Sequence, residues 1–159
     1  MTPAAQTLLS AFEGGYEDLD AIMVVMSESF DPEFGEAWSR SQCSGILAQP
    51  GVWISLICDG DEPAGFALAR SVVDEAELLL IGVRPNFRGR GLGRKLLERT
   101  CATAAALGAK KLHLEMREGN DAEALYRMQG FEPVGRRKRY YRGQSGCRYD
   151  AITWSLVLG

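Results

Sequence analysis

The chain has 159 residues, of which 46% are hydrophobic and 25% charged, and its formal net charge is −3. These proportions are typical of a globular protein and exclude a disordered or fibrous chain. A domain of this length buries roughly 70% of the surface that its unfolded chain exposes. The acidic net charge argues against a surface that binds nucleic acid throughout, and the apolar runs are too short to span a bilayer. We therefore predict a single domain over residues 1–159, with no membrane contact and no direct nucleic-acid binding.

The N-terminal residues and the cysteines indicate the compartment. Residues 1–12 have no basic residue ahead of a short apolar patch, so they lack the pattern of an export signal. The cysteines are Cys43, Cys58, Cys101 and Cys147. They form no CxxC pair and His113 is the only histidine, which favours free thiols over a zinc site or a disulfide framework. We expect a cytoplasmic protein without a metal.

The first half of the chain predicts a strand, two helices and a hairpin. Residues 10–16 have the pattern of a short strand, and apolar side chains at helical spacing predict a helix over residues 18–30. A weaker helix is predicted over residues 36–48, with Trp38 on its inner face. Residues 52–58 and 64–73 are rich in strand formers and flank a turn sequence, so we expect an antiparallel hairpin.

The next segments predict a buried strand, a long helix and a second strand. Residues 77–83 are almost continuously apolar, which is typical of a central strand covered on both faces. Gly82 within this strand fits a bulge that opens the sheet. Apolar side chains return at helical spacing over residues 92–107, and residues 111–117 alternate strictly between apolar and polar side chains.

The last third predicts a short helix and two strands. The helix covers residues 120–129, with Asn120 as its cap, and the strands cover residues 131–142 and 149–158. The predicted fold class is α+β, with a single mixed, mostly antiparallel sheet of about seven strands flanked by about four helices. Only the fourth and fifth strands should run parallel, because a helix connects them.

A loop rich in glycine and arginine joins the buried strand to the long helix. With the start of the helix it reads Arg88-Gly89-Arg90-Gly91-Leu92-Gly93-Arg94. Backbone N–H groups are unpaired at a helix N-terminus, where the helix dipole also favours anions. Glycines allow close approach of a phosphate, and arginines add charged donors. The loop therefore predicts binding of a diphosphate, although a loop without a ligand is the alternative.

Other glycine-rich motifs fit the loop less well. A dinucleotide-binding GxGxxG turn fails because position 94 is Arg, and a phosphate-binding P-loop would need Gly-Lys-Ser/Thr at its end. Segments of Arg and Gly that bind RNA are usually repetitive, whereas this one is single and lies between ordered elements.

Glu115 and Tyr126 are candidates for acid and base chemistry. Glu115 lies on the polar face of the strand over residues 111–117, and Tyr126 lies on the helix that follows. Both can face one cleft and move protons in a group transfer. Glu115 could also be a solvated partner of a neighbouring basic residue, and Tyr126 a core aromatic.

The loop between its strand and helix resembles the acetyl-CoA motif of the GNAT superfamily of N-acetyltransferases. That motif is Gln/Arg-x-x-Gly-x-Gly/Ala, and Arg88, Gly91 and Gly93 match it. The resemblance implies that acetyl-CoA binds here. It also implies that the preceding strand offers its backbone to the pantetheine arm and the acetyl carbonyl, at Ile81, Gly82 and Val83.

The chain also resembles the bacterial ribosomal-protein-alanine N-acetyltransferases of the RimI type, and this resemblance covers roughly residues 30–158. The matching segments are Leu114-Glu115-Met116-Arg117-Glu118-Gly119-Asn120, Ala124-Leu125-Tyr126, Gly130-Phe131, Arg137, Tyr140-Tyr141 and Asp150-Ala151. The resemblance implies that Glu115 accepts a proton, Tyr126 donates one and Asn120 touches acetyl-CoA, although Asn120 could be only a helix cap. The implied acceptor is the N-terminal alanine of a small-subunit ribosomal protein.

Two departures from the RimI-type pattern concern the site. The interval from Asn120 to Tyr126 is one residue shorter than usual. This difference affects whether the Tyr126 hydroxyl points toward the leaving thiolate. The approach to Trp38 is longer, and Ala37 stands where the family often has proline. This approach would border the peptide groove, so the acceptor peptide stays open.

The acceptor can be narrowed by the pKa of its amine. An α-amine with a pKa of roughly 7.7–8.0 is partly unprotonated at neutral pH. The side chain of lysine has a pKa near 10.4, so its deprotonation costs roughly 3.5 kcal/mol more. Glu115 therefore suits an α-amine. We expect Trp38, Tyr140 and Tyr141 to bind the acceptor, although the basic strand that carries the two tyrosines could be only a charged sheet edge. The alternatives are a small-molecule amine as acceptor and a module that binds CoA or the ribosome without catalysis.

Overall fold

The structure is a computed structural model that describes residues 9–159, and its side chains from residue 14 onward. The absence of an export signal was inferred mainly from residues that lie outside this range. The strands are β1 (Leu9–Gly14), β2 (Val52–Asp59), β3 (Glu62–Val72), β4 (Glu75–Val83), β5 (Lys111–Arg117), β6 (Glu132–Arg142) and β7 (Arg148–Val157). The α-helices are α1 (Leu19–Ser29), α2 (Arg40–Leu47), α3 (Leu92–Ala106) and α4 (Glu123–Gln129), and the 3-10 helices are η1 (Tyr16–Asp18), η2 (Pro32–Phe34) and η3 (Pro85–Phe87).

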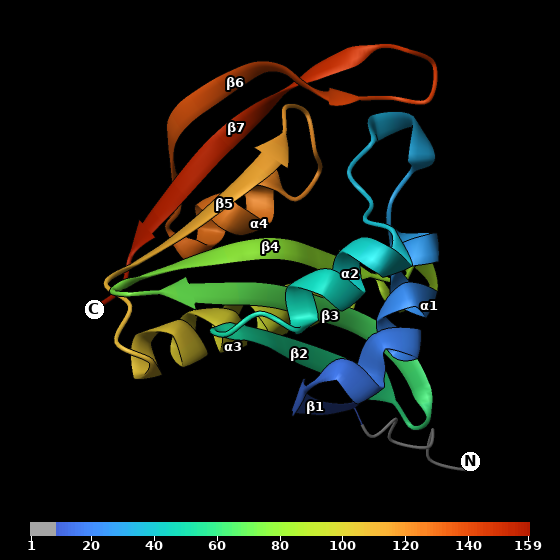
Figure 1. Cartoon of the computed structure of the whole chain (residues 1–159), viewed down its shortest axis with the longest axis vertical. Helices are drawn as coiled ribbons and strands as arrows, with labels where there is room; N and C mark the ends of the chain where they lie inside the picture. The colour runs from blue at the N-terminus through green and yellow to red at the C-terminus, as the bar shows by residue number, and fades with distance from the viewer. Residues whose placement is uncertain (1–8) are drawn as a thin grey trace, which may run out of the picture.

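The seven strands form one sheet in the order β1-β2-β3-β4-β5-β7-β6 (Figure 1). All neighbours run antiparallel except β4 and β5, which are parallel as predicted. Their pairing is short, because only residues 75–78 of β4 face residues 111–114 of β5. Beyond Leu78 the two strands separate, and the sheet opens between them.

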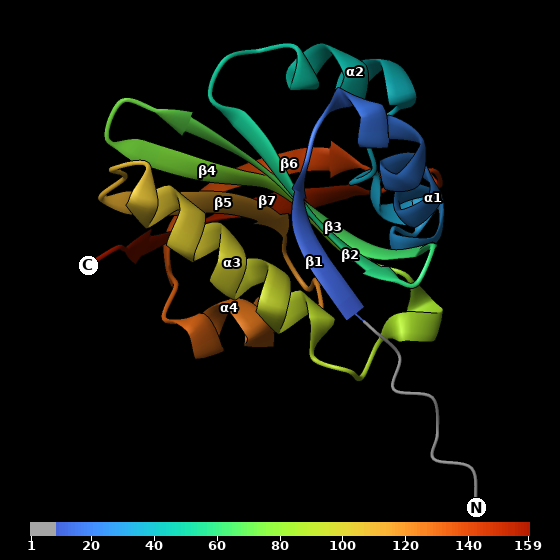
Figure 2. The ribbon, with the colours of Figure 1, turned by 90° about the horizontal axis from the view of Figure 1, so that it is seen from below.

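Helices cover both faces of the sheet (Figure 2). α1 and α2 lie on one face, and α3 and α4 lie on the other. Each face has its own core: Ile22, Val25 and Phe66 are buried on the α1 side, and Leu96 and Trp154 on the α3 side. Full burial of such side chains contributes about 1.5–3 kcal/mol each, so both cores fix the helices that border the opening of the sheet.

Two helices begin later than the sequence predicts. Ser39 caps α2, because its Oγ accepts the N–H of Gln42 at 3.1 Å while Gln42 Oε1 accepts the N–H of Ser39 at 2.8 Å. This reciprocal cap outweighs the weak helical pattern before it, so residues 36–39 are not helical. Asn120 precedes α4 by three residues instead of starting it, and its Oδ1 accepts the N–H of Ala122 at 2.8 Å.

The prediction of a bulge at Gly82 is wrong. The register of β3 and β4 shifts at Leu79, because Leu68 faces Leu80 whereas Ala69 faces Leu78. Gly82 serves a different purpose: a Cβ there would lie 3.1 Å from both Cβ and Oγ of Ser29. Its lack of a side chain therefore lets the end of α1 approach β4.

A wider bulge interrupts β6 and was not predicted. Arg137 pairs with Ala151 and Tyr141 with Tyr149, so three residues of β6 face a single residue of β7. Arg139 within the bulge has a φ of 56°, which is unusual for a residue other than glycine.

Among residues 9–159, no helix has the length and apolar character needed to cross a membrane.

Candidate active site

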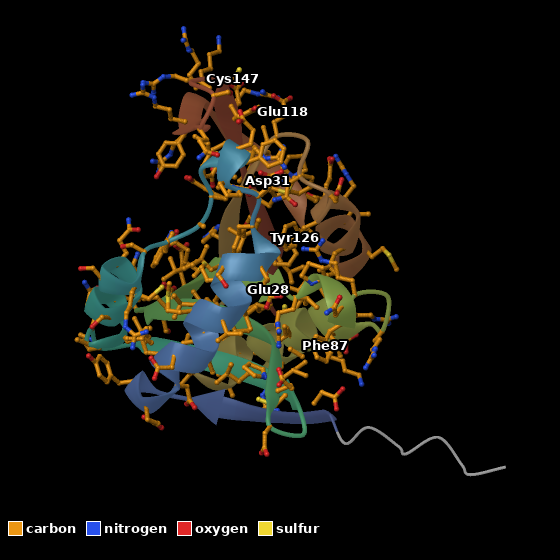
Figure 3. The ribbon with its side chains drawn as sticks, turned by 90° about the vertical axis from the view of Figure 1, so that its right-hand side faces the viewer. Glu28, Asp31, Phe87, Glu118, Tyr126 and Cys147 are labelled. Carbon is orange, nitrogen blue, oxygen red and sulfur yellow. The ribbon has the colours of Figure 1, made fainter. Side chains whose placement is uncertain are left out.

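A cleft of about 860 Å³ lies where β4 and β5 separate. Its walls are the outer half of β4, the end of β5, the start of α4 and the segment that follows α1. The predicted site residues that line it are Trp38, Ile81, Gly82, Val83, Arg88, Gly93, Glu115, Asn120, Tyr126 and Tyr141. In the view of Figure 3, Tyr126 is seen between Phe87, next to the glycine-rich loop, and Asp31, in the segment that follows α1. The cleft thus brings together residues from all parts of the predicted site.

The glycine-rich loop forms one end of the site. Gly91 adopts a left-handed conformation with a φ of 75° directly before α3, and no side chain caps this helix. The N–H groups of the first turn are therefore available to an anion. Gly89 has a φ of 79°, and a Cβ at either glycine would meet no atom within 4 Å. Leu92 is buried in the core, so only its backbone can face a ligand.

The three arginines of the loop already have partners within the chain. Arg88 donates to the carbonyl oxygens of Val83 at 3.3 Å and Ser29 at 3.1 Å, which ties β4 to α1. Arg90 pairs with Asp59 at 3.5 Å and Arg94 with Glu98 at 2.9 Å. Exposed ion pairs of this kind contribute little stability, so Arg90 and Arg94 can exchange them for phosphate contacts.

Glu115 of β5 lines the cleft and also contacts β7, the neighbouring strand, and β6 beyond it. Its Oε1 lies 3.0 Å from Nε of Arg137 on β6 and accepts a hydrogen bond from Thr153 Oγ1 on β7 at 3.5 Å. The side chain of Glu115 is 22% exposed. Both contacts fall on one oxygen, so Oε2 can interact with a water molecule or an amine. Glu115 is therefore both a partner of a basic residue on another strand and a residue of the cleft.

Tyr126 lies in the first turn of α4 and is only 5% exposed. Its ring packs edge-on against Phe131, with 5.8 Å between the ring centroids. Burial raises the pKa of the Tyr126 phenol well above its usual value, and the nearby groups of Glu36 and Tyr141 raise it further. Tyr126 is therefore both a core aromatic and a cleft residue, and it carries its proton at neutral pH.

Glu36 was not identified from the sequence as a site residue. It belongs to the strap, the name used here for residues 31–36 between α1 and α2. Its Oε1 lies 3.0 Å from Arg117 Nε and its Oε2 accepts from Asn120 Nδ2 at 2.8 Å. The Arg117 guanidinium stacks on the Phe34 ring, 3.6 Å from its centroid. Side chains alternate along β5, so Arg117 lies on the same face of the sheet as Glu115. This alternation could have identified Arg117 as a site residue from the sequence.

The β6–β7 hairpin forms the other end of the site. The rings of Tyr140 and Tyr141 pack edge-on with 5.1 Å between their centroids, but only Tyr141 lines the cleft, and Tyr140 is 52% exposed. Burial raises the pKa of Tyr141, and the carboxylates of Glu36 and Glu115 raise it further. Trp38 lines the cleft from the extended segment before α2 and packs on the α1 core.

Within residues 9–159, no three His, Cys, Asp or Glu side chains gather in a way that could hold a metal ion. The four cysteines of this range are free thiols.

Comparisons with known proteins agree with this geometry. A sequence profile described as "Acetyltransferase (GNAT) family" matches residues 19–131. A "[Ribosomal protein bS18]-alanine N-acetyltransferase" of Salmonella typhimurium is 38% identical over 122 residues, which cover 76% of this chain and 81% of that protein. Its counterpart in Haemophilus influenzae is 36% identical over 102 residues, covering 64% and 70%.

A solved structure gives the same result over nearly the whole chain. The crystal structure of the ribosomal-protein-S18-alanine N-acetyltransferase from Escherichia coli superposes with a TM-score of 0.85 and 29% identity. The match covers 96% of this chain and 95% of that one. The profile match, the similarity to these relatives and the shared fold together show that the chain belongs to the GNAT family of acetyltransferases.

Proposed function

We propose that this N-acetyltransferase moves the acetyl group of acetyl-CoA to the N-terminal alanine of ribosomal protein bS18, in the cytoplasm. The observation that supports this most is the cleft, which connects the loop before α3 to Glu115 and Tyr126. The names of the relatives from Salmonella typhimurium and Haemophilus influenzae support the acceptor.

The residues of the cleft fit acetyl-CoA. The uncapped N-terminus of α3 and the left-handed Gly91 suit its diphosphate. Beyond Leu78, backbone groups of β4 that point toward β5 have no strand partner, so those of Ile81 and Val83 can bond the pantetheine amides, whereas the carbonyl of Gly82 is directed at β3. When bound, acetyl-CoA supplies a thioester whose carbonyl carbon the amine attacks, with CoA as the leaving thiolate.

Glu115 is the proposed proton acceptor for the amine. An α-amine with a pKa of about 7.8 is about 14% unprotonated at pH 7, so its deprotonation costs only about 1 kcal/mol at that pH, and Glu115 has to accept a proton against this small cost. The free Oε2 can do so directly or through one water molecule. Glu36 is a poor substitute, because both of its oxygens are already bonded to other side chains.

Tyr126 is the proposed proton donor for the leaving thiolate. Its phenol stays protonated because burial raises its pKa, so it can always offer a hydrogen bond. The same raised pKa makes full proton transfer to a thiol of pKa about 8.5 unfavourable. Tyr126 therefore assists departure mainly as a hydrogen-bond donor.

The acceptor peptide is proposed to enter the cleft between Trp38, in the segment before α2, and Tyr141 of β6, both of which line it. Tyr140 and the basic residues of β6 are exposed beside it and can contact the peptide beyond its first residues. Substitution of both tyrosines by Phe should therefore raise the KM of the peptide more than that of acetyl-CoA.

The proposal is tested by release of free CoA from acetyl-CoA with two peptides. One has the N-terminal sequence of bS18 with a free alanine, and the other has a blocked N-terminus and an internal lysine. Activity with the free terminus alone is expected. Activity with the blocked lysine peptide alone would overturn the choice of an α-amine, and activity with neither would favour a small-molecule amine.

A further inference from the structure

The strap crosses from α1 to the far half of the sheet and is fixed there at several points (Figure 1). Glu33 accepts hydrogen bonds from Tyr149 Oη at 3.2 Å and from the N–H of Ser145 at 3.1 Å. The ring of Phe34 packs edge-on against Tyr149, with 5.4 Å between centroids. These contacts attach the strap to the hairpin without any contribution from Glu36.

Glu36 has partners of its own, Arg117 at the end of β5 and Asn120 in the segment before α4. Its side chain is 12% exposed and that of its partner Arg117 is 11% exposed. The second oxygen of Glu36 takes the hydrogen bond from Asn120. A carboxylate that is buried to this extent is costly unless it is paired, and here both oxygens have partners.

The bond to Glu36 fixes the orientation of the Asn120 amide. Its Oδ1 accepts the N–H of Ala122, and its Nδ2 donates to a carboxylate, which accepts but cannot donate. A flipped amide would lose both bonds. Of the two N–H groups on Nδ2, one is used and the other can reach an acceptor in the cleft, which Asn120 lines.

We propose that Glu36 is a positioning residue of the acetyl-CoA site, which holds the Asn120 amide so that its second N–H faces a carbonyl of the pantetheine arm. The inference rests on the proposed contact between Asn120 and acetyl-CoA. The strap that carries Glu36 is also where the chain departs from the RimI-type pattern by its length. Glu36 thus connects the strap to the pantetheine arm of acetyl-CoA through the Asn120 amide.

The test is the equilibrium dissociation constant of acetyl-CoA, measured by isothermal titration calorimetry with no acceptor present. Glu36→Ala and Asn120→Ala should each weaken binding about 10-fold, the size expected for a hydrogen bond of ordinary strength. The double variant should bind no more weakly than Asn120→Ala, because Glu36 acts through Asn120. Glu36→Gln keeps one acceptor oxygen, for which Asn120 and Arg117 compete, and should weaken binding less than Glu36→Ala does, by about 3-fold. The control Glu33→Gln changes the same strap and should bind like the wild type.

Three results would overturn the proposal. One is an unchanged constant in Glu36→Ala, and another is a double variant about 100-fold weaker than the wild type, since independent effects multiply. The third is equal weakening in Glu36→Gln and Glu36→Ala together with lower midpoints of urea unfolding, which would indicate a role in folding alone. No acceptor is used, so a failed peptide assay leaves this measurement intact.

Discussion

Replacement of Tyr126 by Phe isolates the hydroxyl group of the proposed acid. The ring is 5% exposed and packs on Phe131, and the Phe side chain preserves this packing. The free energy of unfolding should therefore change by less than about 1 kcal/mol. We expect kcat to fall about 10²-fold, at the low end for general acid catalysis, because the raised pKa of the phenol makes it a reluctant proton donor.

The pH dependence separates this phenol from an ordinary one. A tyrosine with a pKa of about 10 would be half ionised at pH 10 and would lose half of its capacity as a donor. An increase of one unit or more leaves about 9% or less ionised at that pH. Since burial raises the pKa of Tyr126, the ratio of wild-type kcat to Tyr126→Phe kcat should stay constant from pH 7 to pH 10. The assay is kcat at saturating concentrations of both substrates, and a ratio that halves between pH 9 and pH 10 would refute the reasoning.

Three further predictions concern other residues. Glu115→Gln should lower kcat/KM about 10²-fold at pH 7, and part of the loss should be recovered at pH 9, where about 94% of an α-amine of pKa 7.8 is unprotonated; an unchanged value at pH 7 would exclude Glu115 as the base. Gly82→Ala should lower the free energy of unfolding in urea by about 1–3 kcal/mol, because its Cβ would lie 3.1 Å from the end of α1. Gly45→Ala within α2 meets no atom within 4 Å and should instead raise it by about 0.5–1 kcal/mol, so equal effects would contradict the packing argument. Hydrogen bonds, first from the side chain of Ser145, lower the pKa of Glu33, so its contribution to stability is present above its unfolded pKa and lost as the pH falls through the folded pKa. The urea midpoints of wild type and Glu33→Gln should therefore differ at pH 7 and converge as the pH falls through the folded pKa of Glu33, and a difference independent of pH would refute this.

Much of the fold could be predicted because local patterns and tertiary packing agree. The alternation over residues 111–117 predicts the bounds of β5, and the helical spacing after the glycine-rich loop predicts α3 to within one residue. Each pattern reflects an element with one apolar face, and in the fold this face is buried between the sheet and its helices. The same alternation directs Glu115 toward the cleft that Tyr126 also lines.

The strap could not be predicted because its contacts are distant in the sequence. The sequence predicts that a helix begins at Glu36, yet the partners of Glu36 lie 81 and 84 residues away. Local propensity near Trp38 is weak, so these bonds and the cap at Ser39 determine where α2 begins. The left-handed Arg139 has no local signal either, because its bulge depends on pairing with β7.

The early end of the β4–β5 pairing has a thermodynamic consequence. Backbone amides on the facing edges of these strands have no strand partner after Leu78 and Leu114, so part of the sheet's hydrogen bonding is left for a ligand to complete. A ligand that binds only the folded chain adds about 2.7 kcal/mol to its stability at a concentration 100 times its dissociation constant. The resistance of this enzyme to unfolding and proteolysis in the cell should therefore rise and fall with the supply of acetyl-CoA.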